Sequence, residues 1–517
     1  MEDIEYDELH DNPSLAKIIV SRDNPTYSSI DGVLYSKDGT KLIRFPPASK
    51  KSTLQVPDSV SSIENGAFWD CTSLTKLTIP NSVTSIGGFA FAYCESLTEI
   101  TISDSVTSIE DDAFNGCTSL NNINVSPNNL AYSSIDGVLY SKDGAKLICF
   151  PPASEKNTFQ VPNSVTTIGR GAFAYCTSLT EITIPNSVTT IGDKAFYGCS
   201  SLTEITIPDS VTSIGEWAFA YCTSLTKITI PNSVTSIGGF AFAYCASLTE
   251  ITIPNSVTSI EWFVFSDCSS LTEITIPNSV TWIGEDAFSG CTSLTKVTIP
   301  NSVTSIEHRA FAYCESLTEI TIPDSVTSIE YEAFSGCTSL TKVTIPNSLT
   351  SMGYYAFYRC VSLTEITIPG SVTSMGYDAF EGCTSLKNIN VSPNNLTYSS
   401  IDGVLYSKDG TELIRFPPGS EKNTFQVPDS VTSIEEWAFY ERTSLTEVTV
   451  PDSVTSIGKW AFDGCRSLTK ITIPDSVTSI GDNAFDACPV TIIATPGSYA
   501  WKFAQKKGIK VVAADKE

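Results

Sequence analysis

The chain has 517 residues, of which 41% are hydrophobic and 17% charged, and its formal net charge is -26. With 57 acidic against 31 basic residues, the chain would repel a phosphate backbone, so nucleic acids and anionic membrane surfaces are not expected partners. No apolar run approaches the ~20 residues that a helix needs to cross a bilayer. The sequence therefore predicts a chain with a large hydrophobic core and no membrane span.

The chain begins with an acidic segment, residues 1–9. A secretory signal would start with lysine or arginine and continue with an apolar block, and neither feature is present in these residues. No surface anchor is recognised in the sequence. A cap comparable to the one expected at the C-terminus is also missing from this end, so we expect the natural protein to begin earlier.

A unit of 23 residues recurs through almost the whole chain, and residues 201–223 are one copy of it. A fixed period in the range of about 20 to 50 residues is typical of a solenoid, in which each added coil extends one continuous core. The sequence therefore predicts a repeat solenoid, mainly β with short helical turns. We expect residues 1–488 to form one continuous array of about 17 coils, counted from the copies of the repeat.

Within one unit, the first strand has the leucine-rich repeat spacing, with apolar residues at Leu202, Ile205 and Ile207. Pro208 ends this strand, because proline cannot donate to a β-ladder. A second extended piece begins with Val211 and Ile214. The unit ends with three apolar residues, Ala218, Phe219 and Cys222. Their spacing predicts a single helical turn that faces the core.

Three insertions interrupt the period near residues 24–52, 129–157 and 395–423. In each insertion two short apolar runs flank an Asp-Gly pair, which is the strongest short-range signal for a β-hairpin. We interpret these hairpins as structural elements that fold over the edge of the solenoid or pack on its flank. Recognition of a ligand by the hairpins is the alternative interpretation.

The end of the chain, residues 489–517, is predicted to cap the solenoid. A helix is expected between Gly497 and Gly508, because glycine at the second boundary is a typical helix stop. Its apolar face would consist of Ala500, Phe503 and Ala504. An open solenoid end needs such a cap, which covers the last coil and is polar outside.

All cysteines except Cys149 occupy the same position of the repeat. Equal positions in successive coils lie about 4.8 Å apart with parallel Cβ directions, which does not suit disulfide geometry. We therefore predict a file of buried free thiols that act as small hydrophobic groups. Arg442 takes one place in this file, which argues against an obligatory half-cystine or metal ligand there. Paired Cys-x-x-Cys motifs, typical of zinc sites, do not occur in the sequence.

Catalytic chemistry has few candidate residues in this sequence. His10 and His308 are the only histidines and are far apart in the chain. No Ser-His-Asp set, phosphate-binding glycine loop or metal-spaced cluster is recognised. The sequence therefore predicts a protein that is not an enzyme and that uses no cofactor or metal.

The two positions before each Ala-Phe pair vary freely between coils, for example between Asp193-Lys194 and Glu216-Trp217. Residues that pack in the core would not vary in this way, so we expect these side chains outside it. Exposed Trp and Tyr are enriched in interaction hot spots. The candidate ligand-binding residues are the aromatic ones, Trp217, Phe240, Trp262, Phe263, Tyr331, Tyr354, Tyr355, Tyr377, Trp437 and Trp460. The alternative is that these rings stack along the flank and shield its edge.

The 23-residue unit, the Asp-Gly-Val-Leu-Tyr-Ser-Lys-Asp-Gly insertion and the C-terminal Gly-Ser-Tyr-Ala together resemble the BspA-like leucine-rich repeat proteins of bacteria and protists. The resemblance extends from about Pro13 to Val511. It implies a right-handed curved solenoid at the cell surface or in the secreted space that binds host proteins or other cells. Three functions stay open: protein binding as an adhesin-like molecule, a structural spacer without a specific ligand, and carbohydrate binding.

Overall fold

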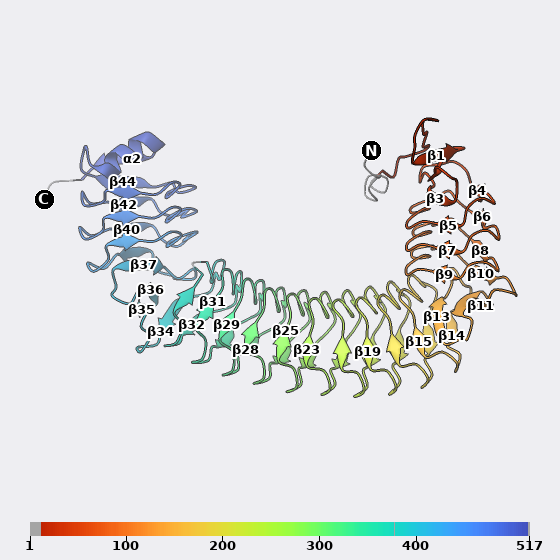
Figure 1. Cartoon of the computed structure of the whole chain (residues 1–517). Coiled ribbons are helices and arrows are strands. Elements are labelled where there is room, and N and C mark those ends of the chain that lie inside the picture. Colours follow the sequence, from red (N-terminus) through yellow and green to blue (C-terminus); the bar gives the residue numbers. More distant parts are fainter. Residues whose placement is uncertain (1–11, 377, 515–517) are drawn as a thin grey trace. The chain divides into compact units, whose positions relative to one another are not determined.

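The computed structural model describes residues 12–376 and 378–514. The chain divides into two compact units, Met1–Leu271 and Thr272–Glu517. In each unit the described residues form coils stacked side by side, and successive coils pair through parallel strands (Figure 1). The predicted fold class, a mainly β repeat solenoid with three hairpin insertions and a C-terminal helix, is confirmed.

The first ladder of unit 1 consists of strands of three or four residues. In β18 (Glu204–Thr206) the middle residue Ile205 is buried and its neighbours are exposed, because successive strand residues point to opposite faces. Pairing joins equal positions one coil apart, so Ile205 faces Ile228. The remaining strands are β4 (Thr53–Gln55), β6 (Lys76–Thr78), β8 (Glu99–Ile102), β10 (Asn122–Val125), β14 (Thr158–Gln160), β16 (Glu181–Thr183), β20 (Lys227–Thr229) and β22 (Glu250–Thr252).

The second ladder of unit 1 consists of two-residue strands. Each ends in an isoleucine that packs in the core, as Ile191 and Ile214 do where β17 pairs with β19. These strands match the second extended piece predicted from the repeat. They are β5 (Ser62–Ile63), β7 (Ser85–Ile86), β9 (Ser108–Ile109), β15 (Thr167–Ile168), β17 (Thr190–Ile191), β19 (Ser213–Ile214), β21 (Ser236–Ile237) and β23 (Ser259–Ile260).

Each insertion of unit 1 contains three antiparallel strands, one more than the predicted hairpin. The predicted turn contains Asp38, whose Oδ1 accepts hydrogen bonds from Ser36 Oγ (2.6 Å) and Thr40 N (3.1 Å). The extra strand precedes a second Asp-Gly turn that the sequence interpretation did not use. The last strand joins the second ladder, with β3 parallel to β5. The strands are β1 (Tyr27–Ile30), β2 (Val33–Ser36), β3 (Lys41–Arg44), β11 (Tyr132–Ile135), β12 (Val138–Ser141) and β13 (Lys146–Cys149).

Unit 2 repeats the same coil and contains the third insertion. Its insertion strands are β35 (Tyr398–Ile401), β36 (Val404–Ser407) and β37 (Glu412–Arg415). Its two-residue strands are β25 (Trp282–Ile283), β27 (Ser305–Ile306), β29 (Ser328–Ile329), β31 (Ser351–Met352), β33 (Ser374–Met375), β39 (Ser433–Ile434), β41 (Ser456–Ile457) and β43 (Ser479–Ile480). Its longer strands are β24 (Glu273–Thr275), β26 (Lys296–Thr298), β28 (Glu319–Thr321), β30 (Lys342–Thr344), β32 (Glu365–Ile368), β34 (Asn388–Val391), β38 (Thr424–Gln426), β40 (Glu447–Thr449), β42 (Lys470–Thr472), β44 (Thr491–Ala494) and β45 (Lys510–Ala513).

The helix α2 (Tyr499–Lys507) closes the C-terminal end of unit 2 (Figure 1). Ser498 caps its start by accepting a hydrogen bond from Trp501 N (3.2 Å). Gly508 ends it in the left-handed conformation, φ 71°. The predicted apolar face is confirmed, because Ala500, Phe503 and Ala504 are the buried residues of the helix.

The core of each unit is built from files of equal residues. The phenylalanine file is the clearest of them: the rings of Phe219 and Phe242 lie 5.4 Å apart and 2° from parallel. Both rings are fully buried. Burial of a phenylalanine side chain stabilises a fold by about 1.5–3 kcal/mol, so the repeated rings make a large contribution to the core.

The segment predicted as a helical turn consists of two consecutive tight turns. Ala220 N donates to Trp217 O (3.2 Å), and Cys222 N donates to Phe219 O (3.2 Å). The intervening amides of Phe219 and Tyr221 donate to the next coil instead. Trp217 and Tyr221 have left-handed φ angles of 59° and 61°. A left-handed residue at these points prevents the i to i-4 hydrogen bonds of a continuous helix.

The cysteine file carries free thiols, and all of them are buried except the half-buried Cys488. Most of these thiols lie within hydrogen-bond reach of a carbonyl of the preceding coil, as Cys222 Sγ does with Phe196 O at 3.2 Å. The same phenylalanine carbonyl also accepts the amide of the cysteine in its own coil, Cys199. Cysteine is thus suited to this position because it is small and apolar, and its S–H is a weak donor.

Candidate functional site

Nine of the ten predicted aromatic residues lie on the same face of their coils, four in unit 1 and five in unit 2, and in each unit we call this face the turn flank. The first variable position before each Ala-Phe pair forms its outer column, and the second forms its left-handed column. Tyr377 lies outside the described residues. The outer column holds Trp262, Tyr331 and Tyr354, and the left-handed column holds Trp217, Phe240, Phe263, Tyr355, Trp437 and Trp460.

The outer column exposes its aromatic rings to solvent. Trp262 is 43% exposed, Tyr331 42% and Tyr354 53%. The ring of Trp262 packs closely against the neighbouring coil, which has Gly239 at the same position. A Cβ atom at Gly239 would collide with Trp262 Nε1. A glycine in one coil therefore makes room for a tryptophan in the next.

The left-handed column stacks its rings on one another. Trp217 and Phe240 are 3.8 Å apart and 6° from parallel, and Phe240 and Phe263 are 4.5 Å apart and 4° from parallel. In unit 2, Trp437 and Trp460 stack at 4.7 Å. These residues are half-buried. The structure thus contains both arrangements that the sequence left open, exposed rings in one column and stacked shielding rings in the other.

The backbone of the left-handed column is strained wherever it carries a side chain. Trp217 has φ 59°, Phe240 60° and Phe263 56°. The left-handed conformation costs an L-residue roughly 1–2 kcal/mol. Gly66 and Gly171 occupy the same position without this cost. Ring stacking and hydrogen bonds between coils offset the strain where an aromatic residue is present.

A further column of rings was not among the predicted site residues. Tyr221 and Tyr244, two positions after the core phenylalanine, stack at 4.4 Å and 9°. Tyr197 packs edge-on against Tyr221 at 5.3 Å. The sequence carried a signal for this column, because the two positions after Ala-Phe also vary between coils. This further column, together with the outer and left-handed columns, widens the aromatic surface of unit 1.

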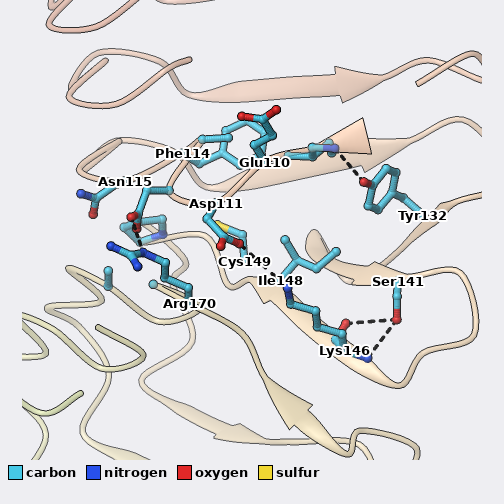
Figure 2. Close-up of a pocket in the computed structure, with 16 residues that line it drawn as sticks. Glu110, Asp111, Phe114, Asn115, Tyr132, Ser141, Lys146, Ile148, Cys149 and Arg170 are labelled. Atoms are coloured by element: carbon cyan, nitrogen blue, oxygen red, sulfur yellow. Dashed lines mark hydrogen bonds and ion pairs between the residues drawn. The ribbon is translucent and has the colours of Figure 1, made fainter. Parts of the chain in front are cut away.

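A cavity of about 180 Å³ lies beside the second insertion of unit 1 (Figure 2). Its inner wall includes the buried residues Cys149 and Phe114. Its rim includes Glu110 and Asp111, which are exposed. The sequence interpretation singled out Cys149 as the cysteine outside the repeat position but did not connect it with a cavity.

Ion pairs between charged side chains lie around this cavity (Figure 2). Asp112 is only 7% exposed, and its Oδ2 accepts a hydrogen bond from Arg170 Nε at 2.6 Å. Arg170 also pairs with Asp193 at 3.3 Å. At the rim, Lys146 Nζ is 4.0 Å from Asp111. Asp112 Oδ1 is buried and accepts no hydrogen bond.

The thiol in the cavity is not suited to nucleophilic chemistry. Burial raises the pKa of Cys149 to about 12. The thiolate is the reactive form of cysteine, and it would be almost absent at neutral pH. Within residues 12–376 and 378–514, no group of three or more His, Cys, Asp or Glu is placed to hold a metal ion. His308 is exposed on the outer column, and His10 lies outside the described residues.

Comparison with known families gives one clear result. The model of the BspA type leucine rich repeat region matches residues 45–140, 148–261, 216–325, 304–419 and 416–499. A comparison with curated proteins finds no match. In the part of the chain that the structure describes, no helix is long and apolar enough to cross a membrane.

Three solved structures are similar to this chain over much of its length. A leucine-rich repeat protein from Bacteroides ovatus is 25% identical, with 96% of this chain and 100% of that chain covered and a TM-score of 0.49. One from Eubacterium ventriosum is 28% identical, with 62% and 94% covered and a TM-score of 0.43. A leucine rich cell surface protein from Faecalibacterium prausnitzii is 28% identical, with 72% and 97% covered and a TM-score of 0.36.

Proposed function

Because this chain belongs to the BspA-type leucine-rich repeat family, whose model matches most of its length, we propose that it is a non-enzymatic binding protein of the cell surface or secreted space. Its ligands are proteins, and its binding surface is the turn flank. This surface includes all the predicted site residues that the structure describes. Tyr377, which lies outside the described residues, is proposed as a further ligand-binding residue.

The observation that carries the proposal is the contrast within each coil between fixed core positions and a variable aromatic surface. Trp262, Tyr331 and Tyr354 are exposed although their hydrophobic area would favour burial. Rings of this kind supply large contact area and few rotatable bonds, which is why they dominate interaction hot spots. The stacked left-handed column behind them provides a rigid support, which lowers the entropy lost on binding.

The absence of enzyme activity is part of the same proposal. Two thiols of the core file, Cys245 and Cys337, are held protonated at neutral pH, because burial raises the pKa of each to about 12. The exposed histidine of the outer column, His308, packs edge-on against Tyr331, with ring centroids 6.3 Å apart. These environments favour packing over acid-base or nucleophilic chemistry.

The proposal is tested with a panel of purified extracellular matrix and serum proteins immobilised on a sensor surface. The variant replaces Trp262, Tyr331 and Tyr354 together by serine. None of the three has a left-handed φ angle, so the backbone should keep its conformation. We expect binding to at least one panel protein and a loss of roughly tenfold or more in the triple variant.

A matched control replaces Leu130 and Leu396 by serine. These residues are 85% and 83% exposed but lie in the insertions, outside the turn flank. The control should bind as the unaltered chain does. Retention of no panel protein at any salt concentration would count against protein binding, and equal losses in both variants would count against the turn flank.

A structural spacer is the second candidate function, and one observation favours it. The rings of Trp217, Phe240 and Phe263 face one another rather than solvent, as expected if they only shield the edge of the coils. A spacer would leave the triple serine variant indistinguishable from the unaltered chain in every interaction assay. Retention on a glycan array that the triple variant loses would instead replace the protein ligand by a carbohydrate.

A further inference from the structure

The residue type at one position differs among the three insertions, and a cavity lies beside the copy that differs. The last residue of the third insertion strand is Arg44 in the first copy, Cys149 in the second and Arg415 in the third. Both arginines are buried, with exposures of 0% and 2%. The cavity of about 180 Å³ lies at the copy that has cysteine.

The two arginines bind their surroundings in the same way. Arg44 Nη1 donates to Gly66 O at 2.7 Å, and Arg415 Nη1 donates to Trp437 O at 2.7 Å. Gly66 and Trp437 are equivalent residues of the left-handed column. The carbonyl at this position is therefore an acceptor for a guanidinium group in two of the three copies.

Acidic side chains of the preceding coil lie close enough to the guanidinium in the third copy to interact with its charge. Burial lowers the pKa of Arg415, and the charges of Glu381 and Asp378 oppose that shift. In the second copy, the residues equivalent to Asp378 and Glu381 are Asp112 and Asn115. The second copy thus keeps oxygen acceptors at these positions but lacks the arginine that would face them.

The cavity in the second copy is lined by these acceptors. Asp112 Oδ1 and Asn115 Oδ1 are buried and accept no hydrogen bond. Gly171 O, equivalent to Gly66 O and Trp437 O, accepts only the turn bond from Ala174 N (3.0 Å) among the described bonds. Arg170 does not satisfy Asp112 Oδ1, because it is bound to the other carboxylate oxygen and reaches toward Asp193.

From this comparison we propose that the cavity beside Cys149 is a receptor for the guanidinium group of an arginine side chain presented by a partner protein. The incoming group takes the place that Arg44 and Arg415 fill from within the chain. It donates to Asp112 Oδ1, Asn115 Oδ1 and Gly171 O. Glu110 and Asp111 at the rim and the net charge of -26 attract cationic segments toward the opening.

Arginine fits this site better than lysine for a geometric reason. The guanidinium is a planar fork of five N–H donors, and it can reach several fixed acceptors at once. A lysine ammonium is a compact, strongly hydrated charge on a flexible chain, so it loses more hydration for fewer directed bonds. The Asp112 carboxylate adds a charge-assisted bond to the guanidinium.

The cavity is lined by none of the aromatic residues that are proposed to bind protein ligands. It can therefore be tested separately, with a small probe. N-acetyl-arginine methylamide is titrated into the full chain by calorimetry, with N-acetyl-lysine methylamide as the comparison ligand. We expect saturable binding of the arginine compound at one site per chain and binding of the lysine compound weaker by roughly tenfold or more. No saturable binding, or equal binding of both compounds, would overturn the proposal.

Two variants at Cys149 distinguish the effect of filling the cavity from the effect of removing the thiol. Cys149→Arg supplies the guanidinium from within the chain, as the other two copies do, and should abolish binding. Cys149→Ser leaves the space open and should bind like the unaltered chain. Binding that persists in C149R, or that C149S also abolishes, would show that the cavity is not the receptor. Thermal unfolding of each variant reports that it is folded.

A second pair of variants tests the carboxylate. Asp112→Asn keeps the shape of the side chain, and asparagine tolerates the left-handed φ of 59° at this position. It should weaken arginine binding roughly tenfold or more. Asp286→Asn is the matched control, because Asp286 is 3% exposed, has φ 52° and lies 3.3 Å from Arg309. Asp286 is not among the residues that line the cavity, so this variant should leave binding unchanged. A loss of equal size in both variants would overturn the assignment.

Discussion

Two files of stacked rings run through the same coils of unit 1, two residues apart in sequence. In the phenylalanine file, Phe219 and Phe242 are fully buried and 5.4 Å apart. In the left-handed column, Trp217 and Phe240 are closer, at 3.8 Å, yet half-buried. The closer file is the one whose residue type varies between coils. Burial, rather than ring contact, therefore decides which positions the repeat keeps constant.

Core positions are constant and flank positions vary because a lost side chain is replaced differently at the two places. A smaller residue in the core leaves a cavity that neither water nor the neighbouring coils can fill well. On the turn flank, water takes the place of a missing ring at little cost. The left-handed backbone of the flank adds a second difference, because glycine is favourable there and unfavourable in the core.

The largest expected effect concerns the thiols that lie beside the phenylalanine file. Burial raises the pKa of Cys245, Cys337 and Cys465 from 9.0 to about 12. A raised folded pKa contributes stability below the unfolded value and loses it as pH rises toward the folded value. Each thiol should therefore cost roughly 1 kcal/mol per pH unit above 9, or about 6 kcal/mol for the three between pH 9 and 11.

Denaturant unfolding at a series of pH values measures this loss. Replacing Cys245 and Cys337 by alanine should flatten the alkaline slope, because alanine cannot ionise in the unfolded chain. A slope that is the same with and without these cysteines would mean that the core file does not control alkaline stability.

Phe219→Ala should have the next largest effect. Loss of this buried ring is expected to lower the free energy of unfolding by about 3–5 kcal/mol, measured by denaturant titration. Tyr354→Ala, which removes a ring that is 53% exposed, is the matched control and should change it by less than about 1 kcal/mol. Similar losses at both positions would contradict the distinction between core and flank.

Arg442→Cys should stabilise the chain by about 1–4 kcal/mol. Arg442 takes the place of a cysteine in the core file, is 3% exposed, and has no partner for Nη1. Burial and the neighbouring Arg415 lower the pKa of Arg442 to about 9, which reflects the cost of a buried charge. The midpoint of chemical unfolding should rise, whereas the exposed control Arg466→Ala should leave it unchanged. A lower midpoint in R442C would show that the arginine stabilises the file.

The smallest effect compares glycine with alanine at the two ring files. At Trp217 both substitutions remove the stacked ring, but glycine relieves the left-handed φ of 59°, so Trp217→Gly should be more stable than Trp217→Ala by about 1 kcal/mol. At Phe219, whose φ is not left-handed, the order should reverse. The same order at both positions, measured by denaturant unfolding, would contradict the role assigned to backbone strain.

Much of the fold could be predicted from the sequence because every coil repeats the same environment. Stacking in register places Ile205 against Ile228 and Phe219 against Phe242, so a residue that recurs must fit beside a copy of itself. The period, the core residues, the hairpin turns and the capping helix follow from that requirement. The continuity of residues 1–488 as one array stays a prediction, as does ligand binding by the predicted aromatic residues.

The sequence by itself thus determined which residues are buried and which are free to vary. Only the tertiary structure decided how the variable residues are arranged: the left-handed φ angles, the stacking of Trp217 on Phe240, and the cavity beside Cys149. Residue type does not identify the left-handed column, which holds glycine, aspartate, arginine and tryptophan alike. Part of the cavity lining forms where Arg170 meets Asp112, 58 residues away across an insertion. Such a contact exists only after the coils on both sides of the insertion have packed.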